Sequence, residues 1–490
     1  MNRRPSTATV LLVASLVIVL TAIAAALAGG RADATPIVGV AFSKNGCRVS
    51  PKTVPAGPTR IRLVNTTARR ASFSAAGRSV GIASKRTRIV TWRLLVGTVR
   101  YACRLGSKGL GRGSLTVTAP PRQPEPVPPP AKEATIAVTG QPEVVFDWST
   151  QKCAEVDIPD SPARAFRDAQ GRIQLIASND VPRRMIGTSL DSLSRQCQPV
   201  MTSHRDPRPE AFDDSEWLFA PYTTDGQTVH ALVHNEYHGE EHGSVACPSG
   251  NNGWCWYASV TLAVSRDAGL TYGHATAPAH LVAAPPARYV PDQAGLGYSG
   301  ATNIVRNPAD GYYYTLIHRA PRGPNGHGPC VMRTRALDEP GSWRFWDGQS
   351  FNGAFASPYP SPTSSQFCSV VVQGLAESLS WNTELGRWLL IGSKAFSLTD
   401  GAFFVSTSTD LVNWTAPRAF HPVELAFTHT CGEPDPKAYA SFLDPSSPDR
   451  NFGVTGRTGW VYYTQLNYQD CHMTYDRDLM RIPVEITTTP

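Results

Sequence analysis

A short phrase recurs along most of this chain and constrains the fold more than any other feature. It is a loop that ends in glycine and runs directly into a stretch of β-branched, aromatic and other apolar residues. After residue 135 it begins at five glycines, which are Gly171, Gly226, Gly311, Gly386 and Gly459. Self-similarity at a steady period indicates a fold assembled from repeated units. The sequence therefore predicts five structural units in this part of the chain.

A second phrase alternates with the first and supports the same division. It usually has serine or threonine two residues before an aspartate, followed by a turn and often an aromatic residue. Its aspartates are Asp191, Asp267, Asp338, Asp410 and Asp476. Short β-type runs lie between the phrases, and no amphipathic helix is evident. Because a small strand meander cannot bury both of its faces alone, we expect residues 135–490 to close into a five-bladed β-propeller.

Charge separates this region from the N-terminal part of the chain. The formal net charge is +7, but residues 1–134 hold 21 basic and 3 acidic residues, and the remainder holds 25 basic and 36 acidic residues. Residues 35–118 contain 16 Lys and Arg and no acidic residue. Such asymmetry indicates different partners for the two parts. We expect residues 35–118 to attract anionic cell-wall polymers or lipid headgroups, with a soluble spacer of incidental charge as the alternative.

The first 34 residues have the layout of a cleaved secretory signal. Arg3 and Arg4 precede an apolar run from Val10 to Ala28, and the small-x-small sequence Ala32-Asp33-Ala34 ends the segment. An uncleaved membrane anchor is the alternative, since the run is close to the length that spans a bilayer. Either reading places the rest of the protein outside the cytoplasm, so nucleic acid is not an expected partner.

The number and position of the ten cysteines support export. All lie beyond the signal, and their number is even, which in an exported chain predicts disulfides. Pairing between neighbours along the chain would join the cysteines as 47–103, 153–197, 247–255, 330–368 and 431–471. The sequence leaves this connectivity open. No pair has the C-x-x-C spacing of a zinc or redox site.

Residues 119–134 are rich in proline and predict an extended spacer between two domains. Residues 35–118 alternate apolar and basic residues, as in Arg60–Val64, which predicts a small β-sandwich. Within it, Cys47–Pro51 and Gly97–Cys103 resemble segments of cupredoxin-like domains. The copper site of that family is not expected here, because residues 35–118 contain no histidine or methionine. We therefore expect no cofactor.

Two turns in the repeat region carry a resemblance to glycosidase propellers. Ser265–Tyr272 matches the Asp-box turn of sialidase-type propellers, and Ser408–Trp414 is similar to a turn in five-bladed glycoside hydrolases of the arabinanase, xylosidase and fructosidase group. In an Asp-box the carboxylate accepts hydrogen bonds from backbone N–H groups of its own turn. We therefore expect Asp267 and Asp410 to be structural, and expect no chemistry from them.

The resemblance implies hydrolysis of a glycosidic bond in an extracellular polysaccharide or glycoconjugate by carboxylates from different blades. Glu377 stands nine residues before Gly386, which implies the general acid, and desolvation would raise its pKa for that role. Asp160 is the expected base or nucleophile. Asp214 or Glu216 is the expected modulator of pKa, and the sequence does not separate the two.

Other polar residues are expected to bind substrate. Arg164 would orient Asp160 or grip an acidic substrate, and Asn303 stands where the resemblance would place a carboxylate. In the polar run that follows, His234, Asn235 and Glu236 are expected to contact sugar hydroxyls. A zinc site in this run is disfavoured, because Asn235 occupies the position that the H-E-x-x-H motif reserves for glutamate.

Two alternatives to a polysaccharide hydrolase remain. A non-catalytic propeller that binds carbohydrate would have the same repeats without the converging carboxylates. A sialidase-like exo-glycosidase would need three arginines around a substrate carboxylate. Arg481-Ile482-Pro483 resembles a sialidase phrase, but it lies at the C-terminus, whereas in sialidases a similar phrase opens the propeller.

Overall fold

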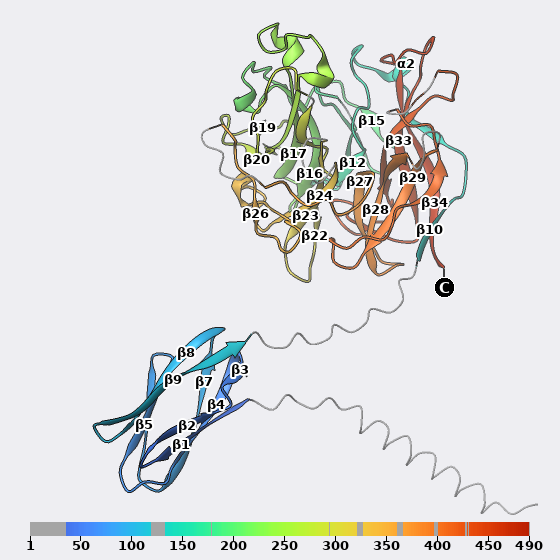
Figure 1. The fold of residues 1–490 in the computed structure, drawn as a ribbon. Helices are drawn as coiled ribbons and strands as arrows, with labels where there is room; N and C mark the ends of the chain where they lie inside the picture. Colours follow the sequence, from blue (N-terminus) through green and yellow to red (C-terminus); the bar gives the residue numbers. More distant parts are fainter. Residues whose placement is uncertain are drawn as a thin grey trace, which may run out of the picture. The chain divides into compact units, whose positions relative to one another are not determined.

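The structure, a computed structural model, describes residues 36–118, 133–177, 179–293, 295–320, 327–359, 366–395, 400–426, 429 and 431–489. The chain forms two compact units, residues 1–130 and 131–490 (Figure 1). The predicted signal and nearly all of the proline-rich spacer lie outside the described residues. Among the helices of the described parts, none is long and apolar enough to cross a membrane.

The N-terminal unit is a β-sandwich of two sheets (Figure 1). One sheet has the order β2 (Gly46–Ser50), β1 (Ile37–Ser43), β4 (Gly57–Asn65) and β7 (Arg86–Leu94). The other has the order β3 (Thr53–Pro55), β9 (Lys108–Thr118), β8 (Gly97–Leu105), β5 (Ala71–Ala75) and β6 (Arg78–Ile82). A disulfide between Cys47 on β2 and Cys103 on β8 links the two sheets.

Alternation along the strands of this sandwich separates core from surface. On β4, Ile61 and Leu63 are buried while Arg60 and Arg62 are exposed. The same holds throughout residues 36–118, where all 16 lysines and arginines are exposed. Since this segment has no acidic residue, its positive charge is not neutralised within the sandwich.

The C-terminal unit is a five-bladed β-propeller (Figure 1). The first blade is β12 (Arg164–Arg167), β13 (Ile173–Ile176), β14 (Arg184–Gly187) and β15 (Ser194–Arg195). The second is β16 (Ser215–Thr223), β17 (Val229–His238) and β18 (Trp256–Ser265), with β19 (Gly273–His274) and β20 (Leu281–Ala283) paired to β18. The third is β21 (Leu296–Ser299), β22 (Val305–Arg306), β23 (Tyr313–Arg319), β24 (Gly328–Thr334), β25 (Arg344–Phe345) and β26 (Gly353–Ala354).

The last two blades complete the ring. The fourth is β27 (Leu375–Asn382), β28 (Arg387–Ala395), β29 (Gly401–Ser408) and β30 (Arg418–Pro422). The fifth is β31 (Lys437–Leu443), β33 (Thr458–Leu466), β34 (Arg477–Thr489) and β10 (Glu133–Val138). Because β10 precedes all the other strands of the unit, its antiparallel pairing with β34 joins the two ends of the propeller. Helix is scarce in the described residues, whose single α-helix is α2 (Trp148–Gln151).

The two sequence phrases fall at equivalent turns of the blades. The glycine phrase lies between β12 and β13, β16 and β17, β22 and β23, and β27 and β28, and at the start of β33 in the fifth blade. The aspartate phrase forms the turns between β14 and β15, β18 and β19, β24 and β25, and β29 and β30 in the first four blades. Asp476 differs and lies between β33 and β34, because the fourth strand of the last blade comes from the other end of the chain.

Asp267 and Asp410 close their own turns, as expected for structural residues. The Asp267 carboxylate accepts hydrogen bonds from the N–H groups of Leu270 and Thr271 at 3.1 and 2.9 Å. The Asp410 carboxylate accepts from the N–H groups of Val412 and Asn413 at 2.9 and 2.7 Å.

Apolar clusters between adjacent blades form the core of the propeller. On β28, Leu389 and Ile391 pack in the cluster shared with the fifth blade, whereas Leu390 packs in the cluster shared with the third. Each sheet is therefore covered on both faces, which explains the continuous apolar runs of its strands.

The ten cysteines form the five disulfides expected from pairing between neighbours along the chain.

Candidate active site

A pocket of about 680 Å³ lies where the blades converge, and all five blades contribute to its lining. Its polar and aromatic lining residues are Asp160, Trp217, Phe219, His234, Glu236, Trp256, Ser299, His318, His327, Gln373, Glu377, Ser393, Lys394 and Tyr439. Asp160 and Glu377, which are 217 residues apart in the sequence, therefore share one pocket. We call it the axial pocket.

Asp160 lies just before β12 and is held by three donors. Its carboxylate accepts hydrogen bonds from the Trp217 indole N–H at 3.3 Å and the Tyr439 hydroxyl at 3.2 Å, and it pairs with the Arg477 guanidinium. Burial raises the pKa of Asp160 above its ordinary value, and the nearby Glu236 adds to this, while the three donors act in the opposite direction. The donors thus support an ionised carboxylate in a desolvated place.

Glu377 lies on β27, and its side chain is almost fully buried. Its Oε2 atom has no hydrogen-bond partner among the described residues. Burial raises the pKa of Glu377 to about 8, against smaller opposing effects from the Ser393 hydroxyl, the backbone of Tyr439 and Ala440, and Arg164. Glu377 is therefore largely protonated at neutral pH, the state required of a general acid.

Glu236 is a third carboxylate in the axial pocket, and its pKa is shifted in the opposite direction to those of Asp160 and Glu377. It lies between His234 and His238, with oxygen to Nε2 distances of 3.2 and 2.9 Å. Burial by itself would raise the pKa of Glu236, but these two histidines lower it below its ordinary value. The pKa of His238 is raised to about 9, because its contacts with Glu236 and Glu240 outweigh burial. Glu236 therefore brings an anion to the axial pocket, and the protonated His238 lies against it.

Irregular backbone directs three of the side chains that line the pocket. The pairing register shifts at Phe219 on β16, at Glu377 on β27 and next to Tyr439 on β31. Tyr439 also has a φ of 64°, in the left-handed region that non-glycine residues seldom adopt. Bulges of this kind re-aim side chains and are common beside active sites.

Arg164, expected to contact Asp160 or substrate, lies at the axis but does not line the pocket. It is buried and donates to the carbonyl oxygens of Ala301 and Glu377 and to the Ser441 hydroxyl, which belong to three other blades. Burial lowers the pKa of Arg164 to about 9. Its contacts indicate that it ties blades together beneath the axial pocket.

Four other expected site residues also lie outside the pocket lining. Asp214 accepts from His242 Nε2 and the His238 N–H at 2.8 and 2.9 Å, and Glu216 is fully buried in a different cluster. Asn235 accepts from the Asp214 N–H at 2.9 Å, and Asn303 bridges to the backbone of Leu379 across two blades. Glu236, not Asp214 or Glu216, is the third carboxylate of the pocket.

Sequence reasoning missed several residues of the pocket. Tyr439 and Arg477 come from the last blade and contact Asp160, but no motif marks them in the sequence. His318 lies in the β-rich run after Gly311, and burial lowers its pKa to about 4, so it is neutral.

Among the described residues, three side-chain groups have spacing suited to a metal, and none includes Asp160, Glu236 or Glu377.

No protein-family model matches the sequence, and no curated protein is similar to it. Similar solved structures include a protein of unknown function from Dyadobacter fermentans, with 10% identity over 72% of this chain and 99% of that chain and a TM-score of 0.41. The catalytic domain of a GH62 alpha-L-arabinofuranosidase from Coprinopsis cinerea has 11% identity, coverages of 71% and 96%, and a TM-score of 0.39.

An endo-arabinase from Bacteroides thetaiotaomicron has 12% identity, coverages of 71% and 98%, and a TM-score of 0.38. Likenesses at this level carry no argument about chemistry. What the propeller does has to be inferred from its own pocket.

Proposed function

We propose that the propeller hydrolyses a glycosidic bond of an extracellular polysaccharide or glycoconjugate. Glu377 is the general acid and Asp160 the base or nucleophile. One observation carries this proposal: two carboxyl groups from different blades line one axial pocket, the partly buried Asp160 paired with Arg477 and the buried Glu377 with an unpartnered Oε2 atom. Two carboxyl groups held by different partners in one pocket are typical of acid and base roles in glycosidases.

The division of roles follows from the contacts. Glu377 keeps its proton at neutral pH and has a free Oε2 atom, so it can protonate the leaving glycosidic oxygen. Asp160 has donors on both oxygens, which favour its ionised form. It then either removes a proton from the attacking water or itself attacks the anomeric carbon. Glu236, held ionised by two histidines, keeps negative charge near the positive charge that develops on the sugar ring.

Aromatic side chains supply a surface for the sugar. Trp217 and Trp256 both line the axial pocket and are half-buried. Aromatic faces pack against the apolar C–H faces of sugar rings, and the indole of Trp217 is fixed in place by its hydrogen bond to Asp160. This arrangement would bind the substrate beside the two catalytic groups.

The test is release of reducing sugar from a panel of polysaccharides by the full-length protein. Glu377→Gln and Asp160→Asn are each expected to lower turnover by at least about 100-fold. The matched control is Glu384→Gln, which alters an exposed glutamate on the same hairpin and should leave turnover unchanged. Equal turnover by the wild type and Glu377→Gln would remove Glu377 from the acid role.

A non-catalytic carbohydrate-binding propeller is the competing function, and the aromatic lining of the pocket is compatible with it. The same panel of polysaccharides distinguishes hydrolysis from non-catalytic binding. Binding measured by calorimetry, without sugar release by the wild type on any bound polysaccharide, would favour the binding protein.

We further propose that the protein is exported by its N-terminal segment and that residues 35–118 hold it on an anionic surface. The support is that all 16 basic residues of the sandwich are exposed, and that residues 35–118 contain no acidic residue. A surface of this kind attracts polyanions through a field that salt screens.

A further inference from the structure

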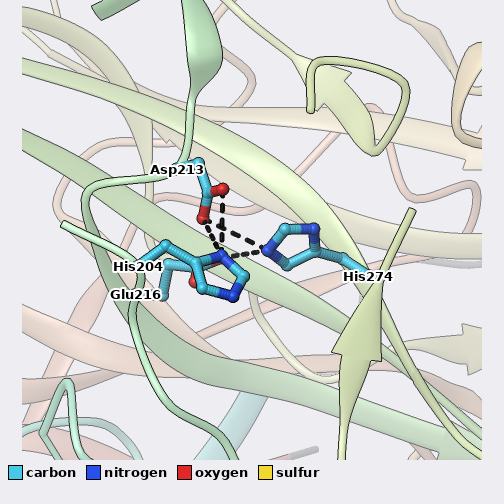
Figure 2. Close-up of side chains that lie close together, drawn as sticks. All are labelled: His204, Asp213, Glu216 and His274. Carbon is cyan, nitrogen blue, oxygen red and sulfur yellow. Dashed lines mark hydrogen bonds and ion pairs between the residues drawn. The ribbon is translucent and has the colours of Figure 1, made fainter. Parts of the chain in front are cut away.

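A cluster of four side chains lies in the second blade, apart from the axial pocket. It comprises His204, Asp213, Glu216 and His274 (Figure 2). Asp213 and Glu216 flank the start of β16, His204 lies in the segment between β15 and β16, and His274 ends β19. None of the four lines the axial pocket, and the proposed hydrolysis does not use them.

The four ligand atoms face one another. His204 Nδ1 lies 2.8 and 3.0 Å from the two oxygens of Asp213. His274 Nε2 lies 3.2 Å from Asp213 Oδ1 and 3.7 Å from Glu216 Oε1, and all four ligand atoms fall within 4.8 Å of one another. Ligand atoms of a tetrahedral zinc ion, at bond lengths of about 2.0 to 2.2 Å, stand about 3.3 Å apart. The cluster therefore needs only small adjustments to hold such an ion.

Glu216 gives a second, independent indication of a cation site. Its side chain is fully buried, and both of its oxygens are without a hydrogen-bond partner among the described residues. Its neighbours in the cluster include a second carboxylate, Asp213. A buried carboxylate without a donor is costly, and a second negative charge beside it adds to the cost. A dication at the centre of the cluster would remove both costs.

The orientation of His274 also suits a metal. Its Nδ1 atom lies 2.7 Å from the Ala275 carbonyl oxygen, which can only accept, so Nδ1 carries the hydrogen. In the neutral ring this leaves the lone pair of Nε2 directed at Asp213 and Glu216. A backbone carbonyl that fixes the tautomer is the usual partner of a metal-bound histidine. The ring also stacks on His280 at a centroid distance of 4.2 Å, which restricts its rotation.

We propose that His204, Asp213, Glu216 and His274 bind one zinc-type divalent cation. Two imidazoles and two carboxylates form a mixed nitrogen and oxygen set, which suits Zn²⁺ better than the all-oxygen preference of Ca²⁺ or Mg²⁺. The exposed side of His204 gives the ion a route from solvent. The ion would fasten the start of β16, and so hold Trp217, the residue after Glu216, against Asp160.

The test uses the full-length protein, stripped with a chelator and titrated with ZnCl₂, CaCl₂ or MgCl₂. We expect one Zn²⁺ per chain by calorimetry and elemental analysis, a rise in the melting temperature, and at least about 10-fold weaker binding of the other two ions. Glu216→Gln removes one ligand with little change of shape, and His274→Gln removes another. Each should weaken Zn²⁺ binding by at least about 10-fold.

Two controls keep the outcome clear. Glu240→Gln alters a separate, more exposed group of His238, Glu240 and Glu241, and His472→Gln alters an exposed histidine. Both should bind Zn²⁺ as the wild type does. Because Glu216→Gln also removes the unpartnered carboxylate, its metal-free form should melt no lower than the metal-free wild type. Absence of stoichiometric Zn²⁺, or equal binding by Glu216→Gln, would overturn the proposal, whatever the result for hydrolysis.

Discussion

Single residues decide which side chains reach the axial pocket. Phe219, Glu377 and Tyr439 lie at or beside register shifts in the first strands of their blades. Regular alternation along a strand would put successive side chains on opposite faces. A bulge breaks that rule at one residue and turns its side chain in a new direction. Only Glu377 of these three was expected from the sequence, and that expectation came from its spacing to Gly386.

Glu377 should give the protein a recognisable pH dependence. Its pKa is about 8 when folded and close to 4.5 when unfolded, so the folded state holds one more proton between these values. The free energy of unfolding should therefore fall as pH rises through this window, by up to several kcal/mol. Any hydrolytic activity that needs protonated Glu377 should also fall as pH rises through about 8.

The measurements are urea unfolding and reducing-sugar release between pH 4.5 and 9. Glu377→Gln should flatten the stability profile over this range, whereas Glu384→Gln, which alters an exposed residue, should retain the slope of the wild type. A slope that is the same in Glu377→Gln would show that other groups cause it.

At the level of elements, the five glycine phrases do not all need glycine for the same reason. Gly171, Gly226, Gly311 and Gly386 have φ between 61° and 81°, where a Cβ is unfavourable. Gly459 lacks such a φ, but a Cβ there would approach the Phe442 ring to 2.5 Å. One sequence phrase therefore reflects two physical requirements, backbone conformation and close packing.

This difference predicts unequal costs of substitution. Gly386→Ala meets no atom within 4 Å and should cost about 1 to 2 kcal/mol of unfolding free energy, from its φ of 61° alone. Gly226→Ala adds a Cβ at 2.5 Å from the Ala169 backbone nitrogen, so it should cost about 3 kcal/mol or more. Urea unfolding of the two variants makes the comparison. Equal costs would mean that the loop at Gly226 moves freely to make room.

At the level of the whole molecule, closure of the propeller depends on β10. Ala134 and Ile136 on this strand are buried in the cluster between the fourth and fifth blades, and its backbone pairs with β34. Without β10, residues 484–489 of β34 would present an unpaired edge, because β11 (Glu143–Phe146) pairs only with residues 479–481, and the cluster would open to water. The ring is therefore fastened by residues from opposite ends of the unit.

A truncated chain tests this closure. Residues 140–490 should lose about 3 kcal/mol or more of unfolding free energy relative to residues 131–490, because Ile136 and its neighbours no longer cover the core. The chain 131–490 should melt at the temperature of the same transition in the full-length protein, since it is a compact unit by itself. Thermal unfolding followed by circular dichroism gives both values. Equal melting temperatures of chains 131–490 and 140–490 would show that β10 does not stabilise the closed propeller.

The cationic sandwich should bind polyanions through charge. Arg60, Arg62 and Arg93 are exposed on the paired strands β4 and β7. Changing all three to glutamine should weaken binding to vesicles of anionic lipid, or to a soluble cell-wall polyanion, by at least about 10-fold at low salt. Raising the salt from 50 to 500 mM should weaken the wild type similarly. The control is Arg457→Gln, an exposed arginine of the propeller. Binding that is indifferent to salt would refute the electrostatic attraction.

The sequence by itself determined the features that depend on local pattern and on composition. The recurrence of turn and strand phrases predicted five all-β blades, because each unit repeats the same short-range requirements. The clustering of basic residues divided the chain into two parts with opposite charge. For the site, spacing to the glycine phrase placed Glu377 and Asp160 on different blades, and both line the axial pocket.

Only the tertiary structure decided which polar groups meet. Glu216 and Glu236 lie on adjacent paired strands, yet Glu236 faces the axial pocket and Glu216 faces His274. Asp160 receives Tyr439 and Arg477 from the last blade only because the ring closes. Strand pairing, bulges and closure bring together residues far apart in the sequence, and a single sequence does not encode these distances in any local pattern.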